Sequence, residues 1–297
     1  MLEVVDLKKK LAKTAYKKEF PKLQERLRGL QYTARDAEIP TIVCIEGWDT
    51  AGKGDIIRRL TARLDPRAFR IYPGTAPSPL EQRHHFLWRY QARLPNDGEI
   101  AVFDHSWYGR VLVERVDKIV PKSEWQKAYE QINEFERWLA EDGQVLVKLW
   151  LHISKKEQKK RFLACEEDPA LAWKITKEYW RHHKQYNKWV KAIEEMLQKT
   201  DTPHAPWTIV EANDLRWARV KVFSTLVKRI EEALAYRQLH PTVVSRTAAA
   251  RAAMKAARAE KAVSDTERAR AEAREAGMPV EEEEPTTKRA AKAKAKD

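Results

Sequence analysis

Few features of this sequence point to a membrane, to secretion or to disulfide bonding. No stretch approaches the 18 consecutive apolar residues that indicate a membrane-spanning helix. The first twenty residues lack the apolar core of a signal peptide. Only two cysteines are present, Cys44 and Cys165, and they form neither a CxxC pair nor a metal-binding spacing. So little cysteine is typical of a reducing compartment, and we expect a cytoplasmic protein.

Aromatic residues are absent after Tyr236, and the rest of the chain is mainly Ala, Arg, Lys and Glu. Such a segment cannot bury enough apolar surface to offset its ordering entropy. We therefore expect one domain over residues 1–240 and a helical or disordered tail over 241–297. Residues 246–297 carry 13 basic and 10 acidic residues, so +10 of the net charge of +13 belongs to the rest of the chain. This positive charge favours a polyanionic partner.

Short apolar runs alternate with longer segments of helical periodicity from Thr41 onwards, which predicts a five-stranded parallel sheet with helices on both faces. The predicted strands are 41–45, 69–72, 100–103, 145–153 and 207–210. The helical segments are 53–64, 78–94, 122–141, 154–199 and 214–236, preceded by one or two amphipathic helices over 1–36 with Pro21 near a helix start. The segment 154–199 is too long and too basic for a simple crossover, and we expect it to form a helical lid.

A glycine-rich loop follows the first predicted strand. Residues 45–60 read IEGWDTAGKGDIIRRL, in which Gly47, Gly52 and Lys53 fit the G-x-x-x-x-G-K-[ST] phosphate loop. Glycine lets several N–H groups converge on one anion, and the following helix adds the positive end of its dipole. The alternative is a glycine-rich turn with a solvated lysine. The predicted phosphate or nucleotide contacts from this loop are Gly47, Trp48, Thr50, Ala51, Gly52 and Gly54.

The loop lacks the hydroxyl that normally follows the lysine and ligates magnesium, because that position is Gly54. Two carboxylates can replace it. Asp49 lies inside the loop, and Asp104 ends the apolar run IAVFD as the acid of a Walker B strand does. Both would open onto the carboxyl edge of a doubly wound sheet. We expect Asp49 and Asp104 to share Mg²⁺, with Mn²⁺ as a substitute; the alternative is an exposed loop acid and a helix cap.

Four stretches of the chain resemble the signature stretches of the polyphosphate kinase 2 family, which includes the polyphosphate:AMP phosphotransferases. They are EGWDTAGKGDIIRRL, FDHSWYGRVLVERV, KLWLHISKKEQKKRF and TPHAPWTIVEANDLRWAR, in order between about residue 20 and about residue 236. The resemblance implies a thymidylate-kinase-like P-loop core with a helical lid. It also implies magnesium-dependent, reversible transfer of the terminal phosphoryl group of inorganic polyphosphate to a nucleoside mono- or diphosphate. The first two stretches look closest to the AMP branch, and a dimer or tetramer is usual for the family.

The resemblance also implies roles for single residues. Asp49, Lys53 and Asp104 match the essential loop and Walker B residues of the family. Arg110, in WYGR, matches a basic residue near the nucleotide, and Arg161, in KKRF, matches a lid arginine over the phosphates. The predicted catalytic residues are therefore Asp49, Lys53, Asp104 and Arg161, acting by direct in-line transfer in which lysine, arginine and magnesium form an electrostatic clamp.

Further basic and imidazole side chains extend the predicted site. His105 stands where the family usually has arginine, so its phosphate contact would carry only partial charge near neutral pH. Lys156 and Lys160 begin the lid helix and are predicted to guide the polyphosphate chain; the alternative is a solvated helix face. His182 and His183 point about 100° apart on a helix. We expect them to be solvated or to contact phosphate, and not to bind a metal.

Two other functions fit parts of this pattern. An ATP-dependent nucleotide or small-molecule kinase would use the same loop, although Gly54 and the basic lid argue against it. A P-loop nucleic-acid-binding module would use the same positive surface. The sequence shows no RNP, zinc-finger or helix-turn-helix pattern, so we expect no nucleic acid partner.

Overall fold

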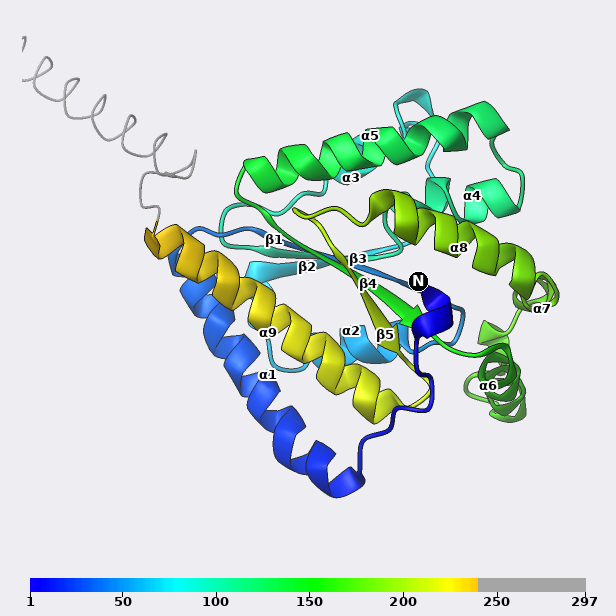
Figure 1. Ribbon diagram of the computed structural model, residues 1–297, viewed down its shortest axis with the longest axis horizontal. Helices are drawn as coiled ribbons and strands as arrows, with labels where there is room; N and C mark the ends of the chain where they lie inside the picture. Colours follow the sequence, from blue (N-terminus) through cyan, green and yellow to red (C-terminus); the bar gives the residue numbers. More distant parts are fainter. Residues whose placement is uncertain (240–297) are drawn as a thin grey trace, which may run out of the picture. The chain divides into compact units, whose positions relative to one another are not determined.

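A five-stranded parallel sheet forms the centre of the computed structural model, which describes residues 1–239 (Figure 1). The strand order is β2-β3-β1-β4-β5. The strands are β1 (Thr41–Gly47), β2 (Phe69–Pro73), β3 (Ile100–Asp104), β4 (Val145–His152) and β5 (Trp207–Glu211). Each begins at the residue where its apolar run begins, which confirms all five predicted strands. The predicted tail, 241–297, lies outside the described residues.

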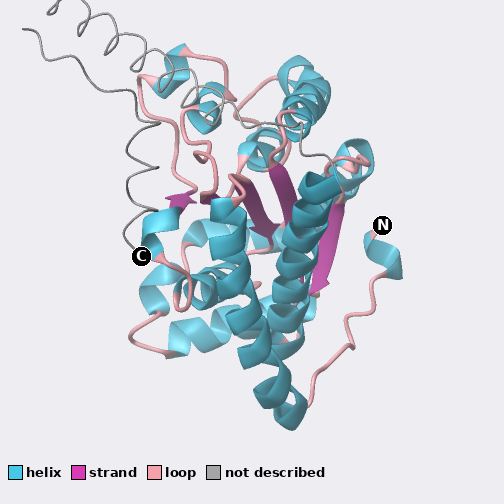
Figure 2. Cartoon of the chain, turned by 90° about the vertical axis from the view of Figure 1, so that its left-hand side faces the viewer, coloured by secondary structure: helices cyan, strands magenta, loops and turns pink. Residues whose placement is uncertain are grey.

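Helices cover both faces of the sheet, as the alternating pattern predicts (Figures 1 and 2). On one face α1 (Lys13–Asp36) packs along α9 (Leu215–Leu239), and the rings of Phe20 and Phe223 meet edge to face with centroids 4.8 Å apart. On the other face lie α5 (Lys122–Glu141) and α8 (Tyr186–Thr200). The remaining α-helices are α2 (Lys53–Thr61), α3 (Trp88–Gln91), α4 (Val113–Val116), α6 (Lys155–Glu167) and α7 (Lys177–Lys184). Among residues 1–239 no helix is both long and apolar enough to cross a membrane.

Burial on both sides explains the composition of the central strands. Every residue of β4 is buried, and six of the seven residues of β1 are. Strands covered on both faces read as continuous apolar runs and do not alternate with polar residues. The polar side chains inside β1 and β4 are therefore exceptions that need partners.

Two helical expectations were wrong. Residues 78–94 form only a 3₁₀ turn, η3 (Glu81–Arg83), and the single turn of α3. Ser78 and Glu81 cap each other, with N···O distances of 2.8 and 3.3 Å, and the backbone becomes extended directly after η3. Pro21 lies inside α1 and not near its start. The burial of Phe20 and the residues after it stabilises the helix across the missing N–H.

The long segment after β4 is divided into several elements. It contains α6, the 3₁₀ turn η5 (Ala172–Lys174), α7 and α8. In α8 the side chains of Ile193, Met196 and Leu197 are completely buried, so this helix belongs to the layer that covers the sheet. Helices α6 and α7 lie at one end of the molecule, beyond the carboxyl ends of the strands (Figure 1).

The topology brings the end of β1 beside the end of β3. The two strands are neighbours, and Ile45 of β1 pairs with Asp104 of β3. From these two strands the chain leaves in opposite directions, because β1 leads to β2 and β3 leads to β4. Such a switch point forms the crevice in which open α/β sheets bind their ligands. The loop after β1 and the acid at the end of β3 therefore open into one crevice.

A buried ion pair fastens the turn after Asp104 to helix α5. The Lys148 ammonium lies 2.7 Å from a Glu136 carboxylate oxygen, and both side chains have no exposed surface. The same ammonium donates to the Tyr108 hydroxyl at 3.0 Å and to the Thr200 carbonyl at 2.6 Å. Glu136 also accepts from Tyr108 and from the Trp107 indole, at 2.6 and 3.0 Å. Every member of this network has a partner, which a buried charge requires.

Removal of the lysine alone should be costly. We expect Lys148→Met to lower the free energy of unfolding by about 3–5 kcal/mol, because it leaves the Glu136 carboxylate buried without a cation. Adding Glu136→Gln should recover part of the loss, since the amide oxygen still accepts from Trp107 and Tyr108 without carrying charge. Urea denaturation measures both. A double variant as unstable as Lys148→Met, or less stable, would contradict the role given to the charge.

Candidate functional site

The loop after β1 needs two of its three glycines for steric reasons. Gly47 has φ of 151°, and a Cβ there would lie 2.6 Å from the carbonyl oxygen of Leu151. Gly52, the N-cap of α2, has φ of 109°, and its Cβ would lie 2.8 Å from Leu215. A Cβ at Gly54 would meet no atom within 4 Å. The missing hydroxyl at position 54 is therefore not the result of crowding.

Lys53 folds back over the loop. Its ammonium donates to the carbonyls of Gly47 and Trp48, at 2.9 and 3.2 Å, and the side chain is half-buried. Its charge helps to lower the pKa of Asp49, but among residues 1–239 no carboxylate oxygen lies within 4 Å of its ammonium. A lysine held only by backbone carbonyls can turn to an incoming phosphate without breaking an ion pair.

Trp48 supports the loop from behind. Its ring stacks on Tyr186 of α8, with centroids 4.1 Å apart and planes 8° apart, and its indole N–H donates to His152 at 3.0 Å. Its backbone N–H donates to Leu151 at 3.2 Å. Burial lowers the pKa of His152 to about 4, against the opposing charge of Glu194, so the ring is neutral and can accept the bond. The structure thus uses both the ring and the N–H of Trp48 to hold the loop in place.

The two predicted acids lie at the same crevice. Burial would raise the pKa of Asp49, but the close contact with His182 and the charges of Lys53, His182 and His105 lower it, so Asp49 is ionised. One oxygen of Asp104, Oδ1, is buried without a hydrogen-bond partner in the structure of residues 1–239. Burial and the negative charges of Asp49 and Asp104 raise the pKa of the Tyr179 hydroxyl. A buried carboxylate oxygen without a donor, beside a second carboxylate, fits a divalent cation.

Glu46 holds the turn that follows Asp104. This buried carboxylate accepts from the N–H and the hydroxyl of Ser106, at 2.7 and 2.9 Å, and lies 3.4 Å from Nδ1 of His105. Burial opposes its ionisation, but the bonds from His105 and Ser106 keep its pKa low. His105 itself has φ of 66° and a side chain that is 48% exposed at the crevice. An acid within the apolar run TIVCIEG was the signal for this residue, which the sequence analysis missed.

Arg161 joins helix α6 to the loop. Its guanidinium donates to the carbonyl of Thr50 at 2.9 Å and to those of Ala212 and Asn213, at 2.7 and 3.1 Å. It also pairs with Glu157 at 2.8 Å. The side chain therefore lies at the predicted phosphate loop, with its N–H groups engaged by backbone oxygens.

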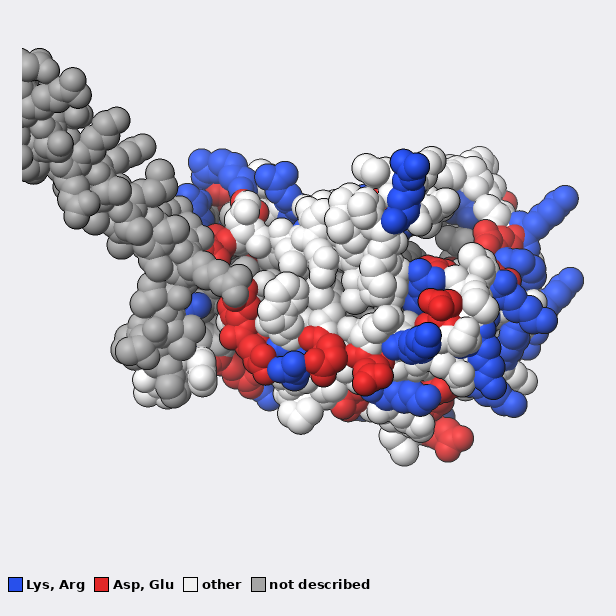
Figure 3. Space-filling view, turned by 90° about the horizontal axis from the view of Figure 1, so that it is seen from above, with Lys and Arg blue, Asp and Glu red and all other residues white. Residues whose placement is uncertain are grey.

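The other predicted residues lie further out. Arg110 pairs with Glu114 at 3.0 Å and covers the ring of Phe86 at 4.7 Å. Lys156 and Lys160 are exposed on α6. Seen from above, the Lys and Arg side chains gather at the end of the molecule where α6 and α7 lie (Figure 3). The structure thus brings the loop, Asp104, His105 and Arg161 together and leaves the two lysines on the basic surface.

The expectation that His182 and His183 are solvated was wrong, because both side chains are largely buried and have protein partners. His183 is buried, with Nδ1 2.8 Å from the amide oxygen of Gln158. His182 lies between two acids, with Nδ1 3.7 Å from Asp49 and Nε2 3.1 Å from Asp117. Burial lowers the pKa of His182, but the interactions with Asp49 and Asp117 outweigh burial and raise the pKa. Helix α7 is thereby fastened to the loop.

One group of side chains has the spacing of a metal site but already holds a cation. Ligand atoms of Asp117, Glu178 and His182 lie within 4.8 Å of one another. Arg181 donates to the same Asp117 oxygen at 2.8 Å and to Glu178 at 3.2 Å. The guanidinium supplies the positive charge that a metal would bring, so we assign no metal to this group.

Comparison with known proteins identifies relatives along most of the chain. The profile of the family Polyphosphate kinase 2 (PPK2) matches residues 10–238. A polyphosphate:AMP phosphotransferase from Pseudomonas syringae pv. tomato is 43% identical over 235 residues, which cover 79% of this chain and 47% of the relative. An ADP-polyphosphate phosphotransferase from Pseudomonas aeruginosa is 36% identical over 228 residues, covering 77% of this chain and 75% of that protein. The chain thus spans about half the length of the first of these relatives.

A solved structure agrees with the fold. The crystal structure of polyphosphate kinase 2 from Arthrobacter aurescens TC1 superposes with a TM-score of 0.75 at 32% identity. The match covers 78% of this chain and 85% of the other. The predicted three-layer P-loop kinase fold is confirmed.

The glycines of the loop should differ in their response to a methyl group. We expect Gly52→Ala to destabilise the protein by about 1–2 kcal/mol, because alanine disfavours a left-handed backbone and its Cβ would collide with Leu215. Gly54→Ala should stabilise it by about 0.5–1 kcal/mol, since position 54 is helical and open. Urea denaturation of both variants checks the pair. Equal destabilisation by the two would show that the geometry of the loop is not the cause.

Proposed function

Because the chain belongs to the polyphosphate kinase 2 family, we propose that it transfers the terminal phosphoryl group of inorganic polyphosphate directly to a nucleotide. The acceptor is a nucleoside mono- or diphosphate, with AMP favoured, and the reaction is reversible and needs a divalent metal ion. One observation carries the proposal: the strand register places Asp104 beside the end of β1, from which the glycine loop with Asp49 and Lys53 continues at the switch point of the sheet. The preference for AMP is supported by 43% identity over 235 residues to an AMP phosphotransferase, whereas ADP enzymes reach 41% over 189 residues and 36% over 228.

The loop is arranged to receive a phosphate. Its glycines turn the backbone at the N-terminus of α2, where unpaired N–H groups and the helix dipole attract anions. Lys53 leaves the carbonyls of Gly47 and Trp48 and neutralises the phosphoryl group in transfer. Asp49 and Asp104 would hold Mg²⁺, or Mn²⁺ in its place. When bound, the metal neutralises charge on the phosphate oxygens.

Other residues position the reactants. Arg161 binds the carbonyl of Thr50 and keeps the lid helix over the loop, from where its guanidinium can also reach a phosphate. His105 and Arg110 follow Asp104 and face the acceptor side, while Lys156 and Lys160 guide the outer part of the polyphosphate chain. The acceptor phosphate is already anionic, so no covalent enzyme intermediate is needed. The group passes in line from donor to acceptor.

Broader features of the proposal come from the sequence. The phosphotransferase domain extends over residues 1–240, and its lid, expected at about 154–199, consists of α6 and α7, because α8 covers the sheet. The protein acts in the cytoplasm, which is supported by two cysteines that are both unpaired. It assembles as a dimer or tetramer and has neither nucleic acid nor membrane partners.

A panel of acceptors tests the function. The full chain is incubated with polyphosphate, Mg²⁺ and each of AMP, ADP, GMP and GDP, and the products are separated by chromatography. We expect AMP to be converted to ADP fastest, with transfer that stops when polyphosphate is removed by an exopolyphosphatase. Equal rates with ATP as the only donor would favour an ATP-dependent kinase instead. Faster conversion of ADP than of AMP would show that ADP is the preferred acceptor.

The metal ligands can be tested apart from turnover. Asp49→Asn and Asp104→Asn should each lower kcat by about 10²–10³-fold, because the loss of a ligand weakens charge stabilisation during transfer. Each should also weaken Mn²⁺ binding, measured by electron paramagnetic resonance with tripolyphosphate present. Asp36→Asn, at the exposed end of α1, is the matched control and should change neither quantity. Wild-type Mn²⁺ affinity in Asp49→Asn would show that this acid does not replace the missing hydroxyl.

A further inference from the structure

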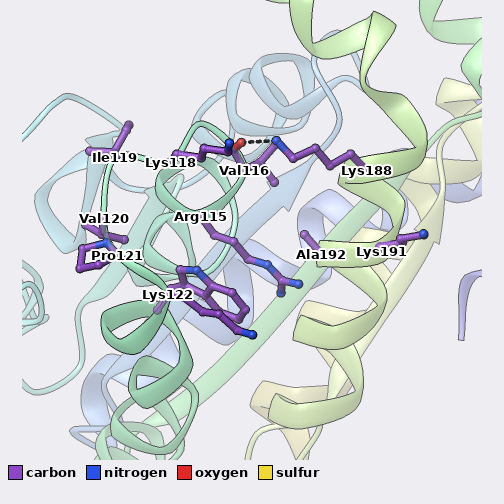
Figure 4. Close-up of a pocket in the computed structure, with 11 residues that line it drawn as sticks. Arg115, Val116, Lys118, Ile119, Val120, Pro121, Lys122, Lys188, Lys191 and Ala192 are labelled. Carbon is purple, nitrogen blue, oxygen red and sulfur yellow. Dashed lines mark hydrogen bonds between the residues drawn. The ribbon is translucent and has the colours of Figure 1, made fainter.

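A cavity of about 750 Å³ lies between α8 and the segment that joins α4 to α5 (Figure 4). Its walls come from residues 115–116 and 118–122, from Trp125 of α5 and from Lys188, Lys191 and Ala192 of α8. No residue of the loop 47–54 lines it, nor do Asp104 and Arg161. The cavity is therefore separate from the crevice at the end of β1 and β3.

Positive charge surrounds this cavity. Four lysines line it, none with a carboxylate partner in the structure of residues 1–239; they are Lys118, Lys122, Lys188 and Lys191. Arg115 also lines it, but Glu195 neutralises that charge at 2.7 Å. No acidic residue belongs to the lining. Unpaired ammonium groups around one cavity repel one another, and an anion bound among them relieves the repulsion.

The rest of the lining is apolar. It contains Val116, Ile119, Val120, Pro121, Trp125 and Ala192. The guanidinium of Arg115 lies 4.1 Å from the centroid of the Trp125 ring and covers part of it. An inorganic polyphosphate chain offers nothing to such a wall, because all of its surface is polar. A ligand that uses both the lysines and the apolar wall carries phosphates and a flat, weakly polar group.

A short chain of contacts links the cavity to the phosphate loop. Lys188 donates to the carbonyl of Val116 at 2.6 Å (Figure 4). The next residue, Asp117, lies 3.1 Å from His182, whose other nitrogen lies 3.7 Å from Asp49 of the loop. A phosphate near Lys188 competes with the Val116 carbonyl for its ammonium. Occupation of the cavity therefore acts on the same segment that fastens helix α7 to Asp49.

We propose that this cavity is a second nucleotide site, which binds a nucleoside di- or triphosphate as an effector. The base lies against the apolar wall beside Trp125, and the phosphates lie among Lys118, Lys122 and Lys191. Its volume falls within the range of small-molecule sites, roughly 300–1,000 Å³. The effector role rests on the proposed function, in which such nucleotides are products; the binding site itself does not.

Photoaffinity labelling locates the site directly. The full chain is labelled with 8-azido-ADP without polyphosphate, and the modified peptides are mapped by mass spectrometry. We expect label on residues 116–125 or 188–192, displaced by ADP far better than by adenosine or tripolyphosphate. The double variant Lys122→Glu/Lys191→Glu should raise the ADP concentration needed for half-maximal displacement at least about tenfold, through lost charge attraction. The control Lys17→Glu/Lys127→Glu changes the net charge equally on exposed helix positions outside the cavity and should match the wild type.

Two results would overturn the site. Label found only around residues 47–54 and 104–110 would show that nucleotides bind the catalytic crevice alone. Displacement by tripolyphosphate as strong as by ADP would assign the cavity to the donor chain. The kinase assay is independent: if the wild type is labelled at the cavity but transfers no phosphate from polyphosphate, the proposed function fails and the nucleotide site stands. If the protein transfers phosphate from polyphosphate but the cavity is not labelled, the proposed function stands and the second nucleotide site fails.

Discussion

The ammonium of Lys148 is completely buried, and the elements around it are arranged so that each supplies a partner for its charge. A strand in the middle of the sheet carries a cation that only neighbours can satisfy. Glu136 comes from α5, the Thr200 carbonyl from the end of α8, and the Tyr108 hydroxyl from the turn after β3. Three elements far apart in sequence are thereby fixed to one point. The turn that begins at Asp104 has little freedom to move as a result.

The crevice above this network differs from it in one respect. Two side chains at its rim have several partners each: Glu46 has Ser106 and His105, and Arg161 has three backbone carbonyls and Glu157. In its centre, Asp104 keeps a buried oxygen without a donor and Lys53 has only backbone acceptors. Rigid surroundings with incomplete groups in the middle are what a preorganised ligand site requires. The incompletely paired groups of Asp104 and Lys53 therefore indicate the position of the ligand.

Local features of this molecule could be predicted from sequence, and features that depend on distant partners could not. The strands begin where apolar runs begin, because two-sided burial demands continuous apolar sequence. The loop and Asp104 were found because their spacing and their positions at strand ends carry the chemistry. His182 and Asp117 are 65 positions apart, and the sequence around either residue does not indicate that the two are in contact. Likewise, the sequence does not show that Lys148 is buried, because its partner Glu136 comes from a different element. The helix expected over 78–94 does not form, because the local hydrogen bonds between Ser78 and Glu81 close a short 3₁₀ turn.

The open space at Gly54 has an evolutionary consequence. Nothing within 4 Å of that position would resist a side chain, and the backbone there is helical. The usual hydroxyl of a phosphate loop is therefore one substitution away, on a scaffold that already carries Asp49. With Asp49 as the proposed ligand, a hydroxyl at position 54 would add a second means of holding the cation on the same loop. A lineage can exchange them gradually, without passing through a protein that has neither.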